Sequence, residues 1–272
     1  MEGNSRDNES GGVLLPEKRR ELIAERLRAV GSVQVATLEQ EFGISSMTAR
    51  RDLRLLEQAG RAERIHGGAV APGPARREDP FRTRLGQAAA AKERLGAIAV
   101  ELVADGETVF VDGSTTAYLA VRRLLATGRR MTVITNSVPV MDLVASSDVP
   151  NTTLIGITGT LRKATRSFVG PNALEAIRGH FADKLIFSVQ GLDGAAIYDA
   201  DPLERDVKRA MMSQARQTVL LIDGSKLDGG GAHSLGNISE LSIAVLDGPP
   251  PKAVRDFETS GVTVRVSEGA AA

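Results

Sequence analysis

The chain of 272 residues has no cysteine, no tryptophan, only three histidines and 3% aromatic residues. The lack of cysteine excludes disulfides, thiolate-held zinc and cysteine nucleophiles. The histidines, His66, His180 and His233, are widely separated in the sequence, so a histidine-based metal site is not expected. We therefore predict neither a metal nor a cofactor.

The sequence also lacks long apolar runs. No segment approaches the roughly 18 apolar residues that a transmembrane helix needs, and the first twelve residues are polar, without the apolar core of a signal peptide. These absences predict a cytoplasmic protein with no membrane partner. Hydrophobic residues make up 42% of the chain, which is ample for a packed core.

An excess of charge of either sign is missing as well. The chain has 34 Lys and Arg against 34 Asp and Glu, which at first argues against a nucleic-acid partner. The average hides a local pattern, because residues 44–64 contain five arginines against three acidic residues. Such a balance predicts modest non-specific DNA affinity, with binding that depends on base contacts and paired half-sites.

The N-terminal part has the pattern of a small DNA-binding domain. Apolar residues recur at helical spacing over 16–30, 37–42 and 45–59. A hairpin with a Gly-Gly turn is expected over 61–70. Three helices followed by a hairpin predict a winged helix-turn-helix domain over residues 14–71.

Two segments around this domain have a different composition. Residues 1–13 are polar and rich in Gly and Ser, which predicts a disordered arm. Residues 72–90 are predicted to be a linker, because its first part is rich in proline. A helix over 81–95 is expected to bridge the two halves of the chain.

The C-terminal part, residues 91–267, alternates short β-rich runs with helical segments. Helices are expected over 116–126, 138–146, 172–179 and 203–216. The strands are expected at 108–111, 131–135, 153–157, 184–189, 218–223 and 243–246. This alternation predicts an α/β domain with a mostly parallel, doubly covered sheet.

The third helix has two distinct faces. Its buried face is formed by Ala49, Leu53 and Leu56, which recur at helical spacing. The opposite face presents arginines, which suit guanine edges and phosphates in a major groove; Met47, Arg51 and Arg54 point away from the core, with Thr48 and Arg50 on the flanks. The alternative is an ordinary solvated face. Ser45 or Ser46 is placed to cap this helix, and Thr37 to cap the preceding one.

The run Thr48–Leu53 (TARRDL) and the wing sequence Arg64–Ala69 (RIHGGA) resemble the winged helix-turn-helix of the DeoR family, bacterial repressors of sugar metabolism. The resemblance covers residues 16–70. It implies that double-stranded operator DNA is contacted by Ser46, Thr48, Arg50 and Arg51, with Arg64 and His66 in the wing. The outward direction of Arg54 adds it to this set.

The best local chemistry in the C-terminal domain follows its first strand. There the chain runs into Asp112-Gly113-Ser114-Thr115-Thr116 and then into a helix. Gly113 permits a tight turn, and the hydroxyls together with the amides at the helix N-terminus would bind an anion. The alternative is that one hydroxyl merely caps the helix. Asn136, Asp223 and Lys226 follow other strand ends and should lie at the same sheet edge; Lys226 and Arg162 are candidate cations for a phosphate.

Residues 91–247 resemble the DeoR-type sensor domain, which shares its fold with ribose-5-phosphate isomerases. The matching stretches are DGSTT (112–116), VITNS (133–137), TGTLR (158–162), SFVGP (167–171), ADK (182–184), ERDVK (204–208) and DGSK (223–226). Many relatives have one more residue in the DGSTT loop. The resemblance implies a phosphorylated sugar or related metabolite as effector, bound by Asp112, Gly113, Ser114, Thr115, Thr116, Asn136, Arg162 and Lys226.

The favoured function is therefore a transcriptional regulator, most often a repressor in this family, without enzymatic activity and acting as a homo-oligomer, dimer or tetramer. The alternatives are a sugar-phosphate aldose–ketose isomerase with an accessory DNA-binding head, and an architectural DNA binder that senses nothing. Asp193, Asp223 and Glu204 are the acids available to an isomerase. Glu204 and Lys208, four residues apart, form either a surface ion pair or part of the rim of the effector site.

Overall fold

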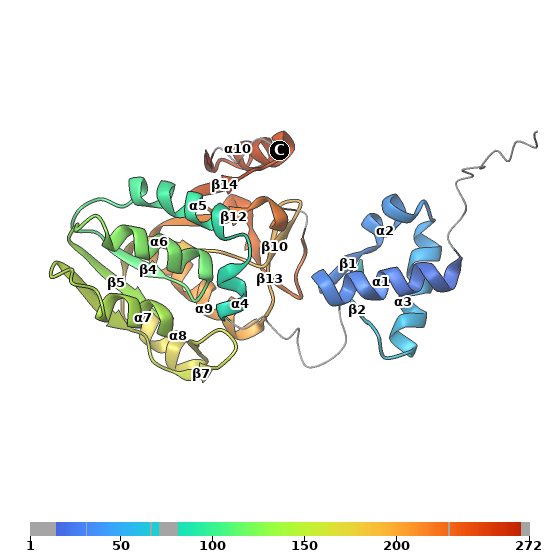
Figure 1. The fold of residues 1–272 in the computed structure, drawn as a ribbon, viewed down its shortest axis with the longest axis horizontal. Coiled ribbons are helices and arrows are strands. Elements are labelled where there is room, and N and C mark those ends of the chain that lie inside the picture. The colour runs from blue at the N-terminus through green and yellow to red at the C-terminus, as the bar shows by residue number, and fades with distance from the viewer. Residues whose placement is uncertain (1–14, 31, 66, 71–80, 228, 268–272) are drawn as a thin grey trace, which may run out of the picture. The chain divides into compact units, whose positions relative to one another are not determined.

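A computed structural model describes residues 15–30, 32–65, 67–70, 81–227 and 229–267 (Figure 1). The chain divides into two compact units, Met1–Gly73 and Pro74–Ala272. The arm predicted over 1–13, His66 and the proline-rich part of the predicted linker fall outside the described residues.

The first unit is a winged helix-turn-helix domain, as predicted. Helices α1 (Pro16–Val30), α2 (Val35–Phe42) and α3 (Ser46–Gln58) share one apolar core that includes Ile23, Leu27, Leu38 and Leu53. The wing is an antiparallel sheet in the order β1-β3-β2, formed by β1 (Ser32–Gln34), β2 (Glu63–Ile65) and β3 (Gly68–Val70).

One local prediction in this unit is wrong, and one short strand was not predicted. Helix α2 begins at Val35 rather than after a Thr37 cap, and β1 has only three residues. The reason is a contact with the wing: the Val35 amide donates to the Gly67 carbonyl at 2.8 Å. This bond satisfies an amide of the first helical turn that a capping side chain would otherwise serve.

The second unit is built on a parallel sheet of seven strands in the order β15-β14-β12-β9-β4-β5-β6. The strands are β4 (Thr108–Val111), β5 (Met131–Thr135), β6 (Thr152–Gly156), β9 (Ala182–Phe187), β12 (Ala215–Asp223), β14 (Ile243–Asp247) and β15 (Thr263–Ser267). The six expected strands are present. Edge strand β15 was missed because most of its side chains are exposed, so it lacks the apolar run of a central strand.

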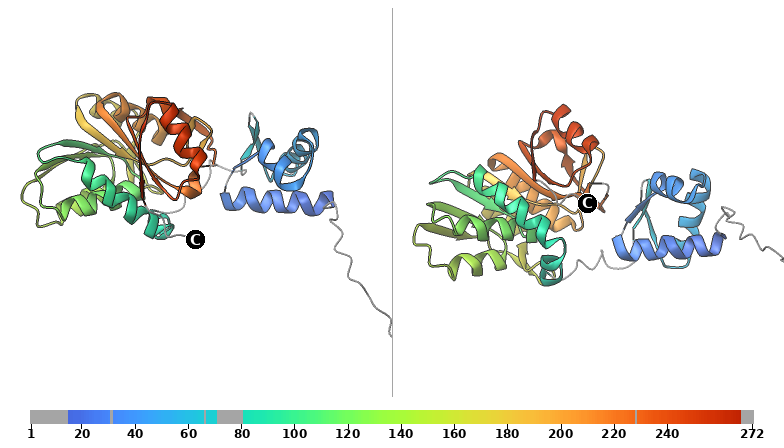
Figure 2. Two further views of the ribbon diagram at one scale, coloured as in Figure 1. Left: turned by 90° about the horizontal axis from the view of Figure 1, so that it is seen from above. Right: turned by 45° about the horizontal axis from the view of Figure 1, so that its top comes forward.

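Helices cover both faces of this sheet (Figures 1 and 2). One face packs against α5 (Ala89–Leu102), α6 (Thr115–Leu125) and α7 (Val138–Ala145), and the other against α8 (Pro171–Arg178), α9 (Pro202–Ser213) and α10 (Pro251–Thr259). Neighbouring strand residues alternate between the two cores: Val109 and Val111 belong to one, Phe110 to the other. The predicted doubly covered parallel sheet is confirmed.

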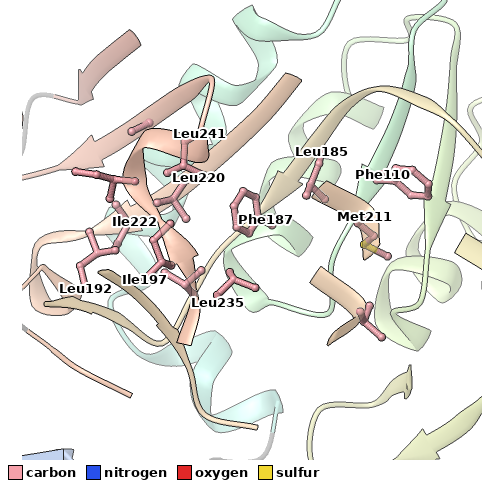
Figure 3. Close-up of a cluster of buried hydrophobic side chains, with 14 of the residues drawn as sticks. Phe110, Leu185, Phe187, Leu192, Ile197, Met211, Leu220, Ile222, Leu235 and Leu241 are labelled. Carbon is pink, nitrogen blue, oxygen red and sulfur yellow. The ribbon is translucent and has the colours of Figure 1, made fainter. Parts of the chain in front are cut away.

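Smaller sheets extend one of these cores (Figure 3). Leu192, Ile197 and Leu235 join Phe187 and Leu220 in a continuous apolar cluster. They come from a three-stranded sheet of β10 (Gly191–Asp193), β11 (Ala196–Asp199) and β13 (His233–Asn237), and a second hairpin is formed by β7 (Thr160–Arg162) and β8 (Ser167–Val169). Short 3-10 helices lie at Gly224–Lys226 and Ile238–Glu240. None of these elements was expected. Strands β7, β8 and β10 have only three residues each, and β13 (HSLGN) contains a single apolar residue.

The helix expected over 81–95 is two helices. Helix α4 (Phe81–Gly86) ends before Ala88, whose φ of 47° is left-handed, and α5 then begins. Phe81 is buried and packs edge-on against Tyr118 of α6, with ring centroids 5.6 Å apart. Part of the predicted linker over 72–90 is thus a helix that belongs to the second unit.

The direction of chain winding reverses at β4. Strands β5 and β6 follow on one side of β4, whereas β9 lies on its other side. In parallel α/β sheets, ligands bind outside the carboxyl ends of the strands at such a switch point. The loop that starts at Asp112 leaves β4 at this place.

Candidate functional sites

Helix α3 starts on a serine cap. Ser45 Oγ accepts a hydrogen bond from the Thr48 amide at 3.3 Å, which decides between the two predicted capping serines. The Thr48 hydroxyl lies 3.0 Å from Ser45 Oγ, so this threonine also supports the helix start. Ser46 is exposed at the first helical position.

The two predicted faces of α3 are present. Ala49, Leu53 and Leu56 are buried in the first unit's core. The opposite face is exposed and carries Met47, Arg50, Arg51 and Arg54. The structure therefore presents the three predicted DNA-binding arginines of α3 on one accessible surface.

A buried ion pair fixes α3 against α1. Asp52 and Arg19 are 3% and 5% exposed, and Arg19 Nε lies 2.7 Å from the Asp52 carboxylate. Arg20 approaches the same carboxylate at 3.5 Å. Asp52, which separates arginines in the sequence, thus orients the helix instead of facing outward.

The wing is connected to the end of α3. The Arg64 amide donates to Glu57 Oε1 at 3.1 Å, and the Arg64 guanidinium lies 3.8 Å from the same carboxylate. Arg64 is the middle residue of β2 and is exposed, so its charge remains accessible beside Glu57. The other predicted wing residue, His66, lies outside the described part of the chain.

Asp112, buried at the end of β4, organises the predicted loop. Its Oδ1 accepts from the Ser114 amide at 3.1 Å and from the Ser114 hydroxyl at 2.6 Å. Ser114 Oγ in turn accepts from the Ala117 amide at 3.1 Å and caps α6. Thr115 and Thr116 open this helix and are both buried. The capping alternative is thus correct for Ser114, and the cap places the two threonines at the sheet edge.

Gly113 is needed for close packing. Its φ is not positive, so the tight left-handed turn that a glycine permits is not used here. A Cβ at this position would lie 3.1 Å from the Ser167 Cβ and 3.7 Å from Glu204 Oε2. The missing side chain lets the loop approach strand β8 and helix α9.

Behind the loop lies a buried charge network that sequence reasoning missed. Lys208 Nζ forms an ion pair with Asp199 and lies 3.4 Å from the Asp112 carboxylate. Burial lowers the pKa of Lys208, but Asp199 and Asp112 more than offset this effect and raise it. Burial also raises the pKa of Asp112, while Lys208 and Ser114 oppose the change. Lys208 is therefore a neutralised structural cation.

The reading of Glu204 and Lys208 as a surface ion pair is wrong, because both side chains are buried. The Ser167 hydroxyl donates to Glu204, and α9 directs both charged residues inward. The signal was available in the sequence, since Val207 and Met211 mark the inward face of α9 and Glu204 and Lys208 lie on its flank.

The other predicted residues, Asn136 and Lys226, each lie just after a parallel strand and contact neighbouring segments there. Asn136 is fully buried, and its Nδ2 donates to the Phe168 carbonyl at 2.9 Å. Its Oδ1 and the neighbouring Ser137 Oγ are buried without a hydrogen-bond partner among the described residues. Lys226 Nζ reaches Ser188 Oγ at 3.2 Å and the Asp223 carboxylate at 3.7 Å, joining the ends of β9 and β12.

Two further cations lie near Lys226, namely Lys92 and Arg84, and the sequence pattern did not identify either of them. Lys92 of α5 is 4% exposed, and its Nζ donates to the main-chain carbonyl of Arg84 in α4. Burial lowers the pKa of Lys92 to about 8, and repulsion from Lys226 and Arg84 adds to this effect against the attraction of Asp223. Burial also lowers the pKa of Lys226. We call Asp112, Thr115, Asn136, Lys92 and Lys226 the sheet-edge cluster.

Arg162, the second predicted cation, has a local partner. Its guanidinium lies 2.9 Å from the carboxylate of Asp201, which caps α9 through the amides of Leu203 and Glu204.

In the described ranges, no three His, Asp or Glu side chains gather as a metal would require, and none of the helices is both long and apolar enough to cross a membrane.

Two family models match the chain, one in each of its two units. Residues 19–74 match the DeoR-like helix-turn-helix domain, and residues 87–248 match the DeoR C terminal sensor domain. A solved ribose 5-phosphate isomerase from Methanocaldococcus jannaschii is 16% identical, with a TM-score of 0.38 over 51% of this chain and 54% of that one. A similarity this low does not bear on the function.

Several curated proteins resemble the chain over nearly its whole length. It is 32% identical to the HTH-type transcriptional repressor GlcR of Bacillus subtilis, over 86% of this chain and 89% of that protein. It is also 32% identical to the HTH-type transcriptional regulator GlpR of Haloferax volcanii, over 92% and 98%. The L-fucose operon activator of Escherichia coli is 28% identical, over 84% and 94%. The chain therefore belongs to the DeoR family of transcriptional regulators.

Proposed function

We propose that this regulator binds a phosphorylated sugar at the sheet-edge cluster and that the ligand alters its affinity for operator DNA. The observation that supports this proposal is the pair of lysines near Asp223, the last residue of β12: Lys92 is 4% exposed, and the side chain of Lys226 is 24% exposed. Burial and repulsion from neighbouring cations lower the pKa of both lysines: Lys226 and Arg84 act on Lys92, and Lys208 and Arg84 act on Lys226. The negative charge of a bound phosphate would offset both effects.

The division of charge favours these two lysines as the phosphate ligands. Lys208 already has Asp199 and Asp112 as partners, and Arg162 has Asp201. Lys92 and Lys226 share Asp223 as the acidic group that attracts both. The amides at the start of α6, with Thr115 and Thr116, supply further donors for the phosphate.

The sugar part of the ligand needs groups that accept and donate hydrogen bonds. Asn136 Oδ1 and Ser137 Oγ are buried without a partner among the described residues, which is costly unless a ligand or water satisfies them. Asp112 is held rigidly by Ser114 and Lys208. A carbohydrate effector is also supported by relatives whose names refer to a fucose operon and an aga operon.

Arg84 connects the cluster to the segment that follows the DNA-binding unit. Helix α4, the first described element after residues 71–80, carries Arg84, whose carbonyl accepts from Lys92. A phosphate that draws Lys92 and Arg84 together would bias the position of α4. A ligand can change DNA affinity only by binding one such arrangement more tightly than another.

The experiment is a thermal-shift screen of the full chain against phosphorylated sugars and their unphosphorylated forms. We expect only the phosphorylated form to stabilise the protein. At a ligand concentration of about 100 times the dissociation constant, the free energy of unfolding should rise by about 2.7 kcal/mol. Lys226→Met should remove this shift, whereas Lys252→Met, at a side chain that is 76% exposed, should retain it.

A second readout connects the cluster to DNA binding. Thr115→Ala should abolish the effect of the same metabolite on operator affinity while leaving affinity without the metabolite unchanged. If the Thr115→Ala protein still responds in full, or if no phosphorylated sugar shifts the melting temperature of the wild type, the sensor assignment fails.

The DNA-binding part of the proposal is a homodimer with two copies of α3. Helix-turn-helix domains bind paired half-sites one helical turn apart, which a two-fold symmetric dimer supplies. Exposed Arg50, Arg51 and Arg54 are the contacts that we assign to α3, and Arg64 the contact from the wing. Sedimentation at micromolar concentration tests the assembly, and a purely monomeric protein on and off DNA would refute it.

A further inference from the structure

Met47 is the most exposed large apolar side chain in the described part of the chain, at 79%. It lies in the first turn of α3, between Ser46 and Thr48. No packing requirement of the first unit's core explains a methionine here, because that core uses the opposite face of the helix.

The position of Met47 on the helix groups it with the arginines. Arg51 and Arg54 follow at i+4 and i+7, so the three side chains lie along one face. Leu55, also exposed on this helix at 38%, is rotated by about 80° from Met47 at 100° per residue. The exposed apolar group therefore shares its helix face with cationic side chains, and such a face matches a polyanion better than an apolar protein surface.

We propose that Met47 contacts the 5-methyl group of a thymine in each operator half-site. The N-terminal residues of a recognition helix are those that approach base edges. The thymine methyl is the apolar group that the bases present in the major groove, and apolar side chains read it by contact. This inference rests on the proposed role of α3 in DNA binding, and it assigns a base to a residue outside the arginine set.

The test starts with selection of a binding site from a random duplex library by the full chain. Each thymine in the selected half-site is then replaced by deoxyuridine, which lacks only the methyl group. For the wild type, one thymine position in each half-site should be sensitive. Replacement of that thymine in a single half-site should weaken binding about four-fold, the effect of one buried methyl group. Replacements elsewhere should have no effect.

Two variants link this loss to Met47. Met47→Gln keeps the length of the side chain but not its apolar end, so the variant should bind the thymine and uracil sites equally. Met47→Leu keeps an apolar end and should remain sensitive. Circular dichroism melting confirms that both variants are folded, which is expected because neither substitution touches the core.

Two results would overturn the inference while the role of α3 stands: a wild type that is insensitive to uracil at every thymine, or a Met47→Gln protein that is as sensitive as the wild type. A selection that enriches no sequence would instead remove the proposed DNA-binding role of α3, and the inference with it. An interface between two protein copies through Met47 would appear as a weaker dimer of Met47→Gln without altered base preference.

Discussion

Single residues at the sheet edge differ in whether their charge is balanced. Lys208 is held between two carboxylates, whereas Lys92 is buried beside other cations and a carbonyl oxygen. The first arrangement stabilises the ionised form, and the second destabilises it. Both lysines are nearly inaccessible to solvent, so burial alone does not distinguish their roles.

The lowered pKa of Lys92 predicts a pH-dependent stability. Below pH 8 the lysine is protonated in both states, so the folded protein bears the full cost of the buried charge. Between pH 8 and about 10.4 the folded state releases its proton before the unfolded state does, and stability should rise with pH from this group. Lys92→Met should therefore be more stable than the wild type at pH 7, by at most about 3 kcal/mol, with the difference vanishing near pH 10.5.

Urea unfolding of the two proteins at several pH values, without phosphate in the buffer, measures this difference. Lys252→Met, at an exposed site, serves as the control and should follow the wild type. A stability difference between Lys92→Met and the wild type that is constant from pH 7 to pH 10.5 would contradict the assigned pKa.

At the scale of elements, a few long-range contacts orient the helices. The Arg19–Asp52 pair joins α1 to α3, and the bond from Val35 to Gly67 joins α2 to the wing. In the second unit, Phe81 packs against Tyr118 and so joins α4 to α6. Each contact links segments that local sequence patterns treat as independent, and the contact with the wing is why the predicted α2 start was wrong.

Removal of the Asp52 carboxylate should loosen the helix-turn-helix. Asp52→Ala removes the carboxylate that the buried Arg19 contacts at 2.7 Å, and loss of one member of a buried ion pair typically costs about 3–5 kcal/mol. Hydrogen exchange should then accelerate at the amides of α1 and α3 and remain unchanged in the seven-stranded sheet. Arg50→Ala, on the exposed face of α3, should leave both exchange rates as in the wild type. Equal protection in Asp52→Ala would show that the pair contributes little.

At the scale of the whole molecule, zero net charge and local arginine clustering act together. The exposed arginines of α3 are the contact surface that we propose for DNA, and the charge-balanced remainder of the chain should add little general attraction to it. Membership of the DeoR family favours a regulator over the isomerase alternative, and the buried hydrogen bond from Ser167 to Glu204 gives this acid a structural partner.

The effect of removing Arg51 should show whether this arginine contacts a base or a phosphate. If Arg51 reads a base, Arg51→Ala should weaken operator binding by about 1–3 kcal/mol and relax one base preference, while the salt dependence stays nearly unchanged. If it contacts a phosphate, affinity should fall for all sequences and the log–log salt slope should shrink by about 0.9. Fluorescence anisotropy at several salt concentrations separates the two, with Arg265→Ala in the sensor unit as the control.

The amino-acid pattern alone predicts the two-part organisation, the inward and outward faces of α3, and the positions of Asp112, Asn136 and Lys226 after the carboxyl ends of parallel strands. These features follow from periodicity and from the geometry of parallel strands, which are local or topological rules. The sharing of charges depends on how distant segments pack: Lys92 joins the cluster from a helix that precedes β4, and Lys208 is neutralised by Asp199 and Asp112. The partner of a buried charge depends on which distant segments pack together, and no local pattern records that choice.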